Sequence, residues 1–218
     1  MDSGHKILLE GAEQLGIRLH SSQIDQFFLY KEEMQRWNQR ISLTSITDEK
    51  EFIVKHFLDS IFWIRWFPPH SFVADIGSGT GLPGIALKIM EPTLRLYLIE
   101  AQKKKANFLR HIVRYLNMAD VTVLEARFED EKVQLLLKKS LDRVIARALG
   151  PIQRWGEAAI PLLKSEGAIV WTLGRQWHEL LGSVEADLRR WGMRLAEYQS
   201  YSLPFKKGER GGALLKLL

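Results

Sequence analysis

Cysteine is absent from the 218 residues of this chain, and its absence removes several kinds of chemistry at once. There can be no disulfide, no thiolate nucleophile and no cysteine-ligated zinc or iron–sulfur site. The six histidines are not spaced like metal ligands, so we expect no metal. Long apolar runs are also lacking, because charged residues interrupt each hydrophobic stretch before it reaches the length of a signal peptide or a membrane span. We therefore expect a cytoplasmic protein that makes no contact with a membrane.

The remaining composition is that of a folded chain. Hydrophobic residues make up 46% and charged residues 26%, which is enough apolar side chain to bury a core. The length fits one domain, with room for a small extension but not for a second full domain. The net charge of +5 permits attraction to a polyanion such as nucleic acid without requiring it.

The first seventy residues have the pattern of amphipathic helices. Apolar side chains recur at steps of three and four over residues 23–40 and again over residues 49–66, and Pro68 and Pro69 end the second run. We expect residues 1–70 to form an N-terminal helical extension. Residues 71–218 are expected to form the main domain, as one compact unit.

Beyond residue 70, short β-rich runs alternate with helical stretches. The expected strands are residues 72–76, 95–99, 121–124, 143–146 and 168–173, and the expected helices are residues 82–90, 102–116 and 151–164. This alternation predicts an α/β fold with a mainly parallel sheet and helices on both faces. Two apolar runs at the end, residues 194–203 and 213–218, are joined by the polar segment 206–212 and predict a C-terminal antiparallel hairpin.

A glycine-rich loop is the strongest local signal. The segment Asp75-Ile76-Gly77-Ser78-Gly79-Thr80-Gly81 lies where the first expected strand turns into a helix that starts near Leu82. Glycines here allow a sharp turn and let a ligand approach the main chain. Two cofactors fit a loop of this kind, because the spacing of Gly79, Gly81 and Gly84 also satisfies the dinucleotide fingerprint.

Asp75 separates the two cofactors. A dinucleotide presents an anionic pyrophosphate, which a carboxylate two residues before the first glycine would oppose. The sulfonium and ammonium of S-adenosylmethionine are cationic and would be attracted, so the loop favours S-adenosylmethionine. Glu100, at the end of the second strand, can accept hydrogen bonds from the ribose hydroxyls of either cofactor. Ala126 and Arg127 follow the third strand, where the adenine would lie, although an exposed loop without a ligand is the alternative there.

Taken in order, these residues resemble the RsmG family, the 16S rRNA guanine-N7 methyltransferases formerly called glucose-inhibited division protein B. The resemblance covers nearly the whole chain and rests on residues 37–38, 43–45, 56–60, 75–85, 108–110 and 146–148. It implies a Rossmann-like class I methyltransferase that converts S-adenosylmethionine to S-adenosylhomocysteine. It also implies methylation of N7 of one guanosine in 16S rRNA, with the rRNA or the 30S ribosomal particle as partner.

The resemblance places Arg147, after the fourth strand, in the substrate pocket. Guanine N7 carries an exposed lone pair, so its methylation needs alignment but no general base. Arg147 is our candidate to hydrogen-bond the base or a flanking phosphate and to contact the cofactor, the alternative being a surface arginine paired with a carboxylate. His56, Asp59 and Ser60 share one helical face and can line the pocket or orient Arg147. The expected cofactor-binding set is Asp75, Gly77, Ser78, Gly79, Gly81, Leu82, Glu100, Ala126, Arg127 and Arg147.

Basic residues supply the candidates for RNA contact. Lys206, Lys207 and Arg210 crowd the expected hairpin loop, and Arg175 stands near Leu173, where members of the family commonly carry lysine. Lys103 to Lys105 and Arg110 lie on a helix and are more typical of a solvated face. We expect a monomer. Two other functions stay open from the residues alone: a class I methyltransferase with another RNA, a protein or a small molecule as substrate, and a binding module without catalysis.

Overall fold

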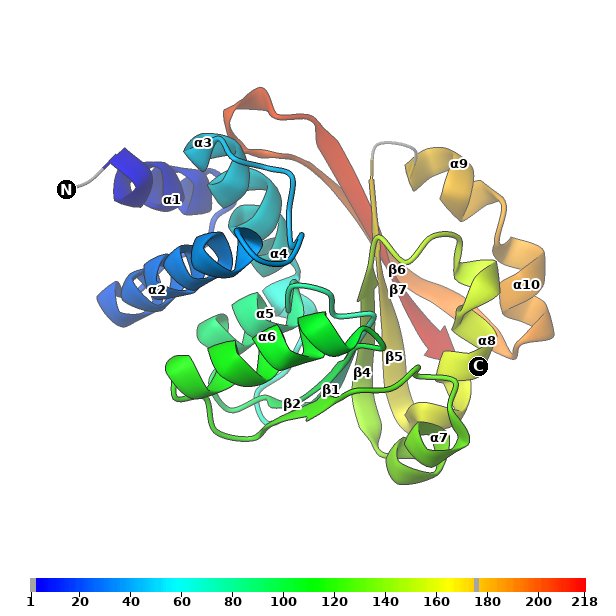
Figure 1. The fold of residues 1–218 in the computed structure, drawn as a ribbon. Coiled ribbons are helices and arrows are strands. Elements are labelled where there is room, and N and C mark those ends of the chain that lie inside the picture. The colour runs from blue at the N-terminus through cyan, green and yellow to red at the C-terminus, as the bar shows by residue number, and fades with distance from the viewer. Residues whose placement is uncertain (1–2, 175–176) are drawn as a thin grey trace.

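The computed structural model describes residues 3–174 and 177–218, which form one seven-stranded sheet with helices on both faces (Figure 1). The strand order is β3-β2-β1-β4-β5-β7-β6, in which β1 to β5 are parallel and β7 runs antiparallel to both its neighbours. The strands are β1 (Phe72–Ile76), β2 (Arg95–Ile99), β3 (Val121–Leu124), β4 (Leu141–Arg147), β5 (Leu163–Leu173), β6 (Met193–Ser202) and β7 (Glu209–Leu217). The predicted α/β architecture and the terminal hairpin are therefore confirmed.

Consecutive residues of the central strands serve two different cores, because side chains of a strand alternate between its faces. Val73 belongs to a core shared with the N-terminal helices, α5 (Gly84–Met90) and α6 (Lys103–Tyr115). Ala74 belongs to the opposite core. That second core is covered by α7 (Glu131–Leu137), α8 (Gly156–Ala159), α9 (Trp177–Gly182) and α10 (Glu185–Arg190), which lie to the right of the sheet in Figure 1.

The N-terminal extension contains α1 (Ser3–Gln14) and α2 (Ser21–Asn38), followed by a third helical segment that changes pitch. The expected single helix over residues 49–66 is divided into α3 (Glu49–Phe52), a π-helical turn η1 (Ile53–Leu58), α4 (Asp59–Ile61) and a 3₁₀ turn η2 (Phe62–Trp66). A π-helical turn places more residues in each turn and is common at functional sites. It changes the direction in which the side chains before and after it point. A prediction that assumes 3.6 residues per turn does not include this change.

The expected helix over residues 151–164 is wrong. The chain there forms the 3₁₀ turn η3 (Ile152–Arg154), α8, and the 3₁₀ turn η4 (Ile160–Leu162), and then enters β5 at Leu163. Pro161 has no amide hydrogen and cannot continue a helix. The carbonyl oxygens of Pro161 and Leu162 instead accept from the amides of Lys139 and Ser140, at 2.9 and 3.0 Å.

The C-terminal hairpin is longer than expected, because β7 begins at Glu209 and includes the glycines that we assigned to the loop. A Cβ on Gly212 would lie 2.4 Å from the ring of Trp63, so glycine lets this side chain of the extension pack on the strand. The loop between the strands holds the 3₁₀ turn η5 (Pro204–Lys206). Its Phe205 amide donates to Gln14 Oε1 at 3.2 Å, which ties the hairpin tip to α1.

Across residues 3–174 and 177–218, the structure contains no helix that is long and apolar enough to cross a membrane.

Candidate active site

The glycine loop connects β1 to α5 and is held by hydrogen bonds from two sides. The Ser78 amide donates to the Ile99 carbonyl at 3.0 Å, which attaches the loop to β2. From the N-terminal extension, the buried Tyr30 hydroxyl donates to the Thr80 carbonyl at 2.5 Å. Gly81 has a φ of +89°, and a Cβ there would lie 2.4 Å from Ile85. The loop therefore has a fixed shape that only glycine permits at this position.

Asp75 lies beneath the loop, buried at the end of β1. Its Oδ2 accepts from the Gly84 amide at 3.0 Å, at the start of α5. Burial raises the pKa of Asp75 to about 7, opposed by the Gly84 hydrogen bond and the charge of Arg147 and assisted by the charge of Glu100. A cation bound above the loop would favour the ionised carboxylate, as we expect for a sulfonium cofactor.

Glu100 directly follows β2, and its side chain contacts the same loop. Its Oε2 accepts from the Gly79 amide and its Oε1 from the Gln102 amide, each at 2.8 Å. Its own amide donates to Leu124 O at 3.0 Å, which aligns the carboxyl ends of β2 and β3. Carboxylate oxygens can accept more than one hydrogen bond, so Glu100 keeps acceptor capacity for a ribose.

The remaining residues of the expected cofactor set differ in their surroundings. Ala126 and Arg127 follow β3 at the same edge of the sheet, and the Arg127 amide donates to Asp130 Oδ2 at 3.0 Å. Leu82 is buried in the first core. Ser78 is also buried, with its hydroxyl donating to the Asp75 carbonyl at 2.7 Å. The side chains of Leu82 and Ser78 thus support the loop from the interior of the protein.

Arg147, at the end of β4, joins the sheet to the extension. Its NH1 donates to Ser60 Oγ at 3.2 Å and to the Lys55 carbonyl at 3.3 Å, and it lies 3.7 Å from Asp59 Oδ2. The side chain is largely buried, so these partners hold the guanidinium in one orientation. Asp59 and Ser60 therefore both contact Arg147.

Asp59 is shared with the C-terminal hairpin. Its Oδ1 accepts from the Tyr201 hydroxyl at 2.5 Å and lies 3.6 Å from Arg210 Nε. Burial raises the pKa of Tyr201, and the adjacent Asp59 carboxylate raises it further, so Tyr201 stays a neutral donor. Sequence analysis missed Tyr201, because it occurs in an edge strand without a motif.

His56 lines the same region without contacting Arg147 directly. Its Nε2 is 2.9 Å from Thr44 Oγ1, and its carbonyl accepts from the Ser60 hydroxyl at 2.5 Å. Burial lowers the pKa of His56 to about 4, and the positive charges of Arg147 and Lys55 add to the effect. His56 is therefore a neutral imidazole at physiological pH.

His56, Asp59 and Arg147 line a cleft with a volume of about 740 Å³. Lys55, Arg147 and Arg210 give it positive charge, and Asp59 is the one carboxylate among its described lining residues. Trp63, Trp155 and Trp171 lie in its walls, but each is at most 3% exposed. The segment after β4 forms the boundary with the glycine loop, since a Cβ on Gly77 would lie 2.8 Å from Leu149. The residues that follow Arg147 therefore border both the glycine loop and the cleft.

The other predicted RNA contacts are only partly gathered here. Arg210 lines the cleft, whereas Lys207 Nζ is 3.2 Å from Glu51 Oε1 on the extension. Lys206 belongs to the turn η5 at the hairpin tip. Arg175 lies outside the described residues. In the part of the chain that the structure describes, no group of three histidine or acidic side chains is arranged to hold a metal ion.

Comparison with protein families gives a match over most of the chain. A family model described as "rRNA small subunit methyltransferase G" matches residues 23–206. The chain is 37% identical over 199 residues to the Ribosomal RNA small subunit methyltransferase G of Roseiflexus sp. (strain RS-1), covering 91% of this chain and 85% of the relative. It is 32% identical over 205 residues to the protein of the same name from Geobacter sulfurreducens, covering 94% of each.

Solved structures support the fold independently. A SAM dependent methyltransferase from Aquifex aeolicus superimposes with a TM-score of 0.59 at 14% sequence identity. The match covers 86% of this chain and 98% of that one. At this identity the likeness concerns the fold, which is the class I methyltransferase arrangement.

Proposed function

Because the chain belongs to the rRNA small subunit methyltransferase G family, we propose that it transfers the methyl group of S-adenosylmethionine to N7 of a specific guanosine in 16S rRNA. The observation that carries this proposal is the position of Arg147. It is close enough to Asp75 to oppose the rise in its pKa, and it lines the cationic cleft at the same time. One side chain therefore links the glycine loop to a pocket suited to an RNA base.

The residues at the glycine loop fit S-adenosylmethionine. Gly79 leaves the backbone open, because a Cβ there would meet only the Gly77 carbonyl oxygen, at 3.8 Å. Asp75 and Glu100 bring two carboxylates to a loop that would hold a cation. Bound there, the cofactor supplies an electrophilic methyl group. Ala126 and Arg127 complete the site on the adenine side.

The reaction requires the protein to align the guanine N7 with the methyl group rather than to transfer a proton. Guanine N7 offers a lone pair without losing a proton, so a neutral His56 is no obstacle. Arg147, held by Ser60 and Asp59, presents a fixed donor to guanine O6 or a flanking phosphate. A base that has left its stack would enter the cleft beside Arg147 and Arg210, which line it.

The rest of the assignment concerns partners and organisation. The substrate is 16S rRNA, alone or within a 30S particle, and Arg175, Lys206, Lys207 and Arg210 contact its phosphates. Arg210 would contact a phosphate inside the cleft, which it lines together with Asp59. The enzyme acts as a cytoplasmic monomer, with residues 1–70 as a helical extension of the methyltransferase domain 71–218.

The test is transfer of labelled methyl from S-adenosylmethionine to 16S rRNA and to 30S particles from cells that lack this protein. We expect one labelled guanosine, which chemical cleavage at N7-methylguanosine would locate. Absence of transfer to both substrates, with cofactor binding intact, would refute the rRNA assignment and direct the search to another RNA, a protein or a small molecule.

A further inference from the structure

A second hollow lies between α2 and α6, away from the cleft. It has a volume of about 460 Å³, and its lining includes Arg36, Trp37, Arg40, His111 and Tyr115. None of these residues lines the cleft that holds Arg147. Side chains of this kind, cationic and aromatic together, are those that bind single-stranded nucleic acid.

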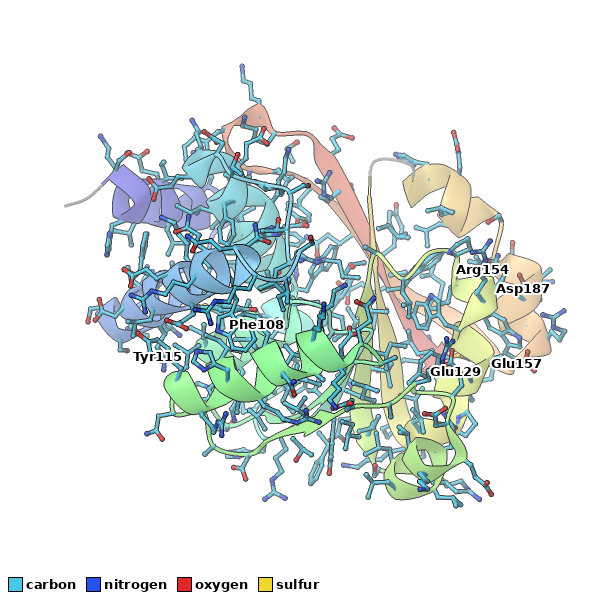
Figure 2. The ribbon with its side chains drawn as sticks, in the orientation of Figure 1. Phe108, Tyr115, Glu129, Arg154, Glu157 and Asp187 are labelled. Carbon is cyan, nitrogen blue, oxygen red and sulfur yellow. The ribbon has the colours of Figure 1, made fainter. Side chains whose placement is uncertain are left out.

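The aromatic part of this α2–α6 groove is a connected series of rings. Trp37 packs edge-on against the buried Phe108, with ring centroids 5.6 Å apart, and lies 5.1 Å from His111. His111 stacks with Tyr115 at 5.8 Å. Tyr115 is 43% exposed and labelled on the left of Figure 2. The series therefore runs from the core to a ring that a base can reach.

Among the described residues that line the groove, the one carboxylate already has positively charged and imidazole partners. Glu33 has a side chain only 5% exposed, and its two oxygens contact Arg36 NH1 and His111 Nε2, each at 2.6 Å. Arg36 nevertheless keeps 65% of its side chain exposed. Arg40 is exposed nearby, so the mouth of the groove is positively charged.

A basic helix connects the groove with the catalytic edge of the sheet. α6 begins just after the carboxyl end of β2, beside Glu100, and its 13 residues span about 20 Å. Lys103 and Lys104 are exposed at its start and Arg114 near its end. Positive charge therefore lies at both ends of α6, near the cofactor edge at one end and next to Tyr115 at the other.

We propose that the α2–α6 groove binds a nucleotide of the substrate RNA outside the catalytic cleft. The base stacks on Tyr115, and Arg36 and Arg40 contact the adjoining phosphates. This inference rests on the proposed RNA substrate but not on which guanosine is methylated. These contacts are additional to those proposed for the hairpin residues, and no sequence motif singled out Arg36, Arg40 or Tyr115.

The test uses Arg40→Ala with Tyr115→Ala, because neither change removes a partner of the buried Glu33. We measure affinity for 16S rRNA over a range of salt concentrations, and KM and kcat for methyl transfer. Affinity should fall about tenfold and KM should rise with it. The slope of log affinity against log salt should decrease by about 0.7 for the lost phosphate contact, whereas kcat and S-adenosylmethionine affinity should not change.

Two controls make the result specific. Tyr115→Phe keeps the ring and should bind RNA like the wild type. Arg189→Ala with Arg190→Ala removes two arginines from α10, on the opposite side of the molecule near the labelled Asp187 in Figure 2, and should have little effect.

Several outcomes would overturn the inference. One is an unchanged KM for the groove variant, and another is an equal loss in the α10 control. A third is a loss seen only with 30S particles and not with naked rRNA, which would make the partner a ribosomal protein. A wild-type protein that methylates neither substrate would refute the proposed function instead. The RNA affinities of the variants would still show whether the groove binds RNA.

Discussion

The two halves of the active site are built in different ways. The cofactor half is local, because Asp75, the glycine loop and Gly84 follow one another along the chain and Glu100 directly follows the adjacent strand. The substrate half joins Asp59 to Tyr201, which are 142 positions apart, and Ser60 to Arg147, which are 87 apart. Damage to one half should therefore leave the function of the other largely intact.

We expect the largest effect from removing Arg147, which should affect the substrate half of the site and not the cofactor half. Arg147→Ala should lower the methyl-transfer rate by about 10²–10³-fold, the usual loss for one preorganised donor. S-adenosylmethionine affinity, measured by calorimetry, should stay nearly the same. Arg147→Lys, which keeps the charge and loses the planar fork, should recover only part of the rate. An equal loss of cofactor affinity would place Arg147 in the cofactor half.

The reciprocal change acts on Asp75. Asp75→Ala should weaken S-adenosylmethionine binding about tenfold, because it removes a buried carboxylate near the cationic ligand and the acceptor of the Gly84 amide. Asp75→Asn keeps the shape and the acceptor but not the charge, so it isolates the electrostatic part. Unchanged calorimetric affinity in both variants would contradict this role.

The halves should also oppose each other in the pH dependence of stability. Asp75 has a pKa near 7 in the fold against 3.8 as its ordinary value, so its contribution falls as pH rises between these values, by at most about 1.4 kcal/mol per pH unit. His56 has a pKa near 4 in the fold against 6.5 as its ordinary value, so its contribution to the free energy of unfolding rises with pH between these two values. The two slopes largely cancel in the wild type.

Single variants should expose each slope. The two pKa shifts overlap between roughly pH 4.5 and 6. In this range the free energy of unfolding of Asp75→Asn should rise more steeply with pH than that of the wild type. The free energy of unfolding of His56→Gln should rise less steeply or fall. Denaturant unfolding at several pH values measures both, and identical slopes in all three proteins would exclude these shifts.

The smallest effect concerns Tyr201, which acts on Arg147 only through Asp59. Tyr201→Phe removes the hydroxyl that donates to Asp59 and should lower kcat about threefold, within the range of one modest hydrogen bond, without changing cofactor affinity. A change in stability alone would limit Tyr201 to a structural role.

Much of the fold was predictable because strand–helix alternation is a local property of sequence. The errors arose where one residue changed the local geometry. Pro161 ended a run with helical spacing, and the π-helical turn at 53–58 altered the pitch of a segment expected to be one regular helix. Asp59 and Ser60 still met Arg147, since they follow the turn together.

The hairpin shows what local spacing could not predict. The cluster of Lys206, Lys207 and Arg210 looked like one cationic surface, yet two of its members lie beside carboxylates of the N-terminal extension, Glu51 and Asp59. The partners are far away in the chain, so no pattern within the loop indicated them.

By itself, the sequence determined the parallel sheet, the glycine loop with its flanking acids and the preference for a cationic cofactor. These features depend on residues that are neighbours along the chain or at the ends of adjacent strands. Only the tertiary structure decided that Asp59 is shared by Arg147, Tyr201 and Arg210, and that Tyr30 holds the glycine loop. The reason is physical: such contacts depend on how the extension and the hairpin pack against the sheet, and the spacing of residues within either segment carries no record of that packing.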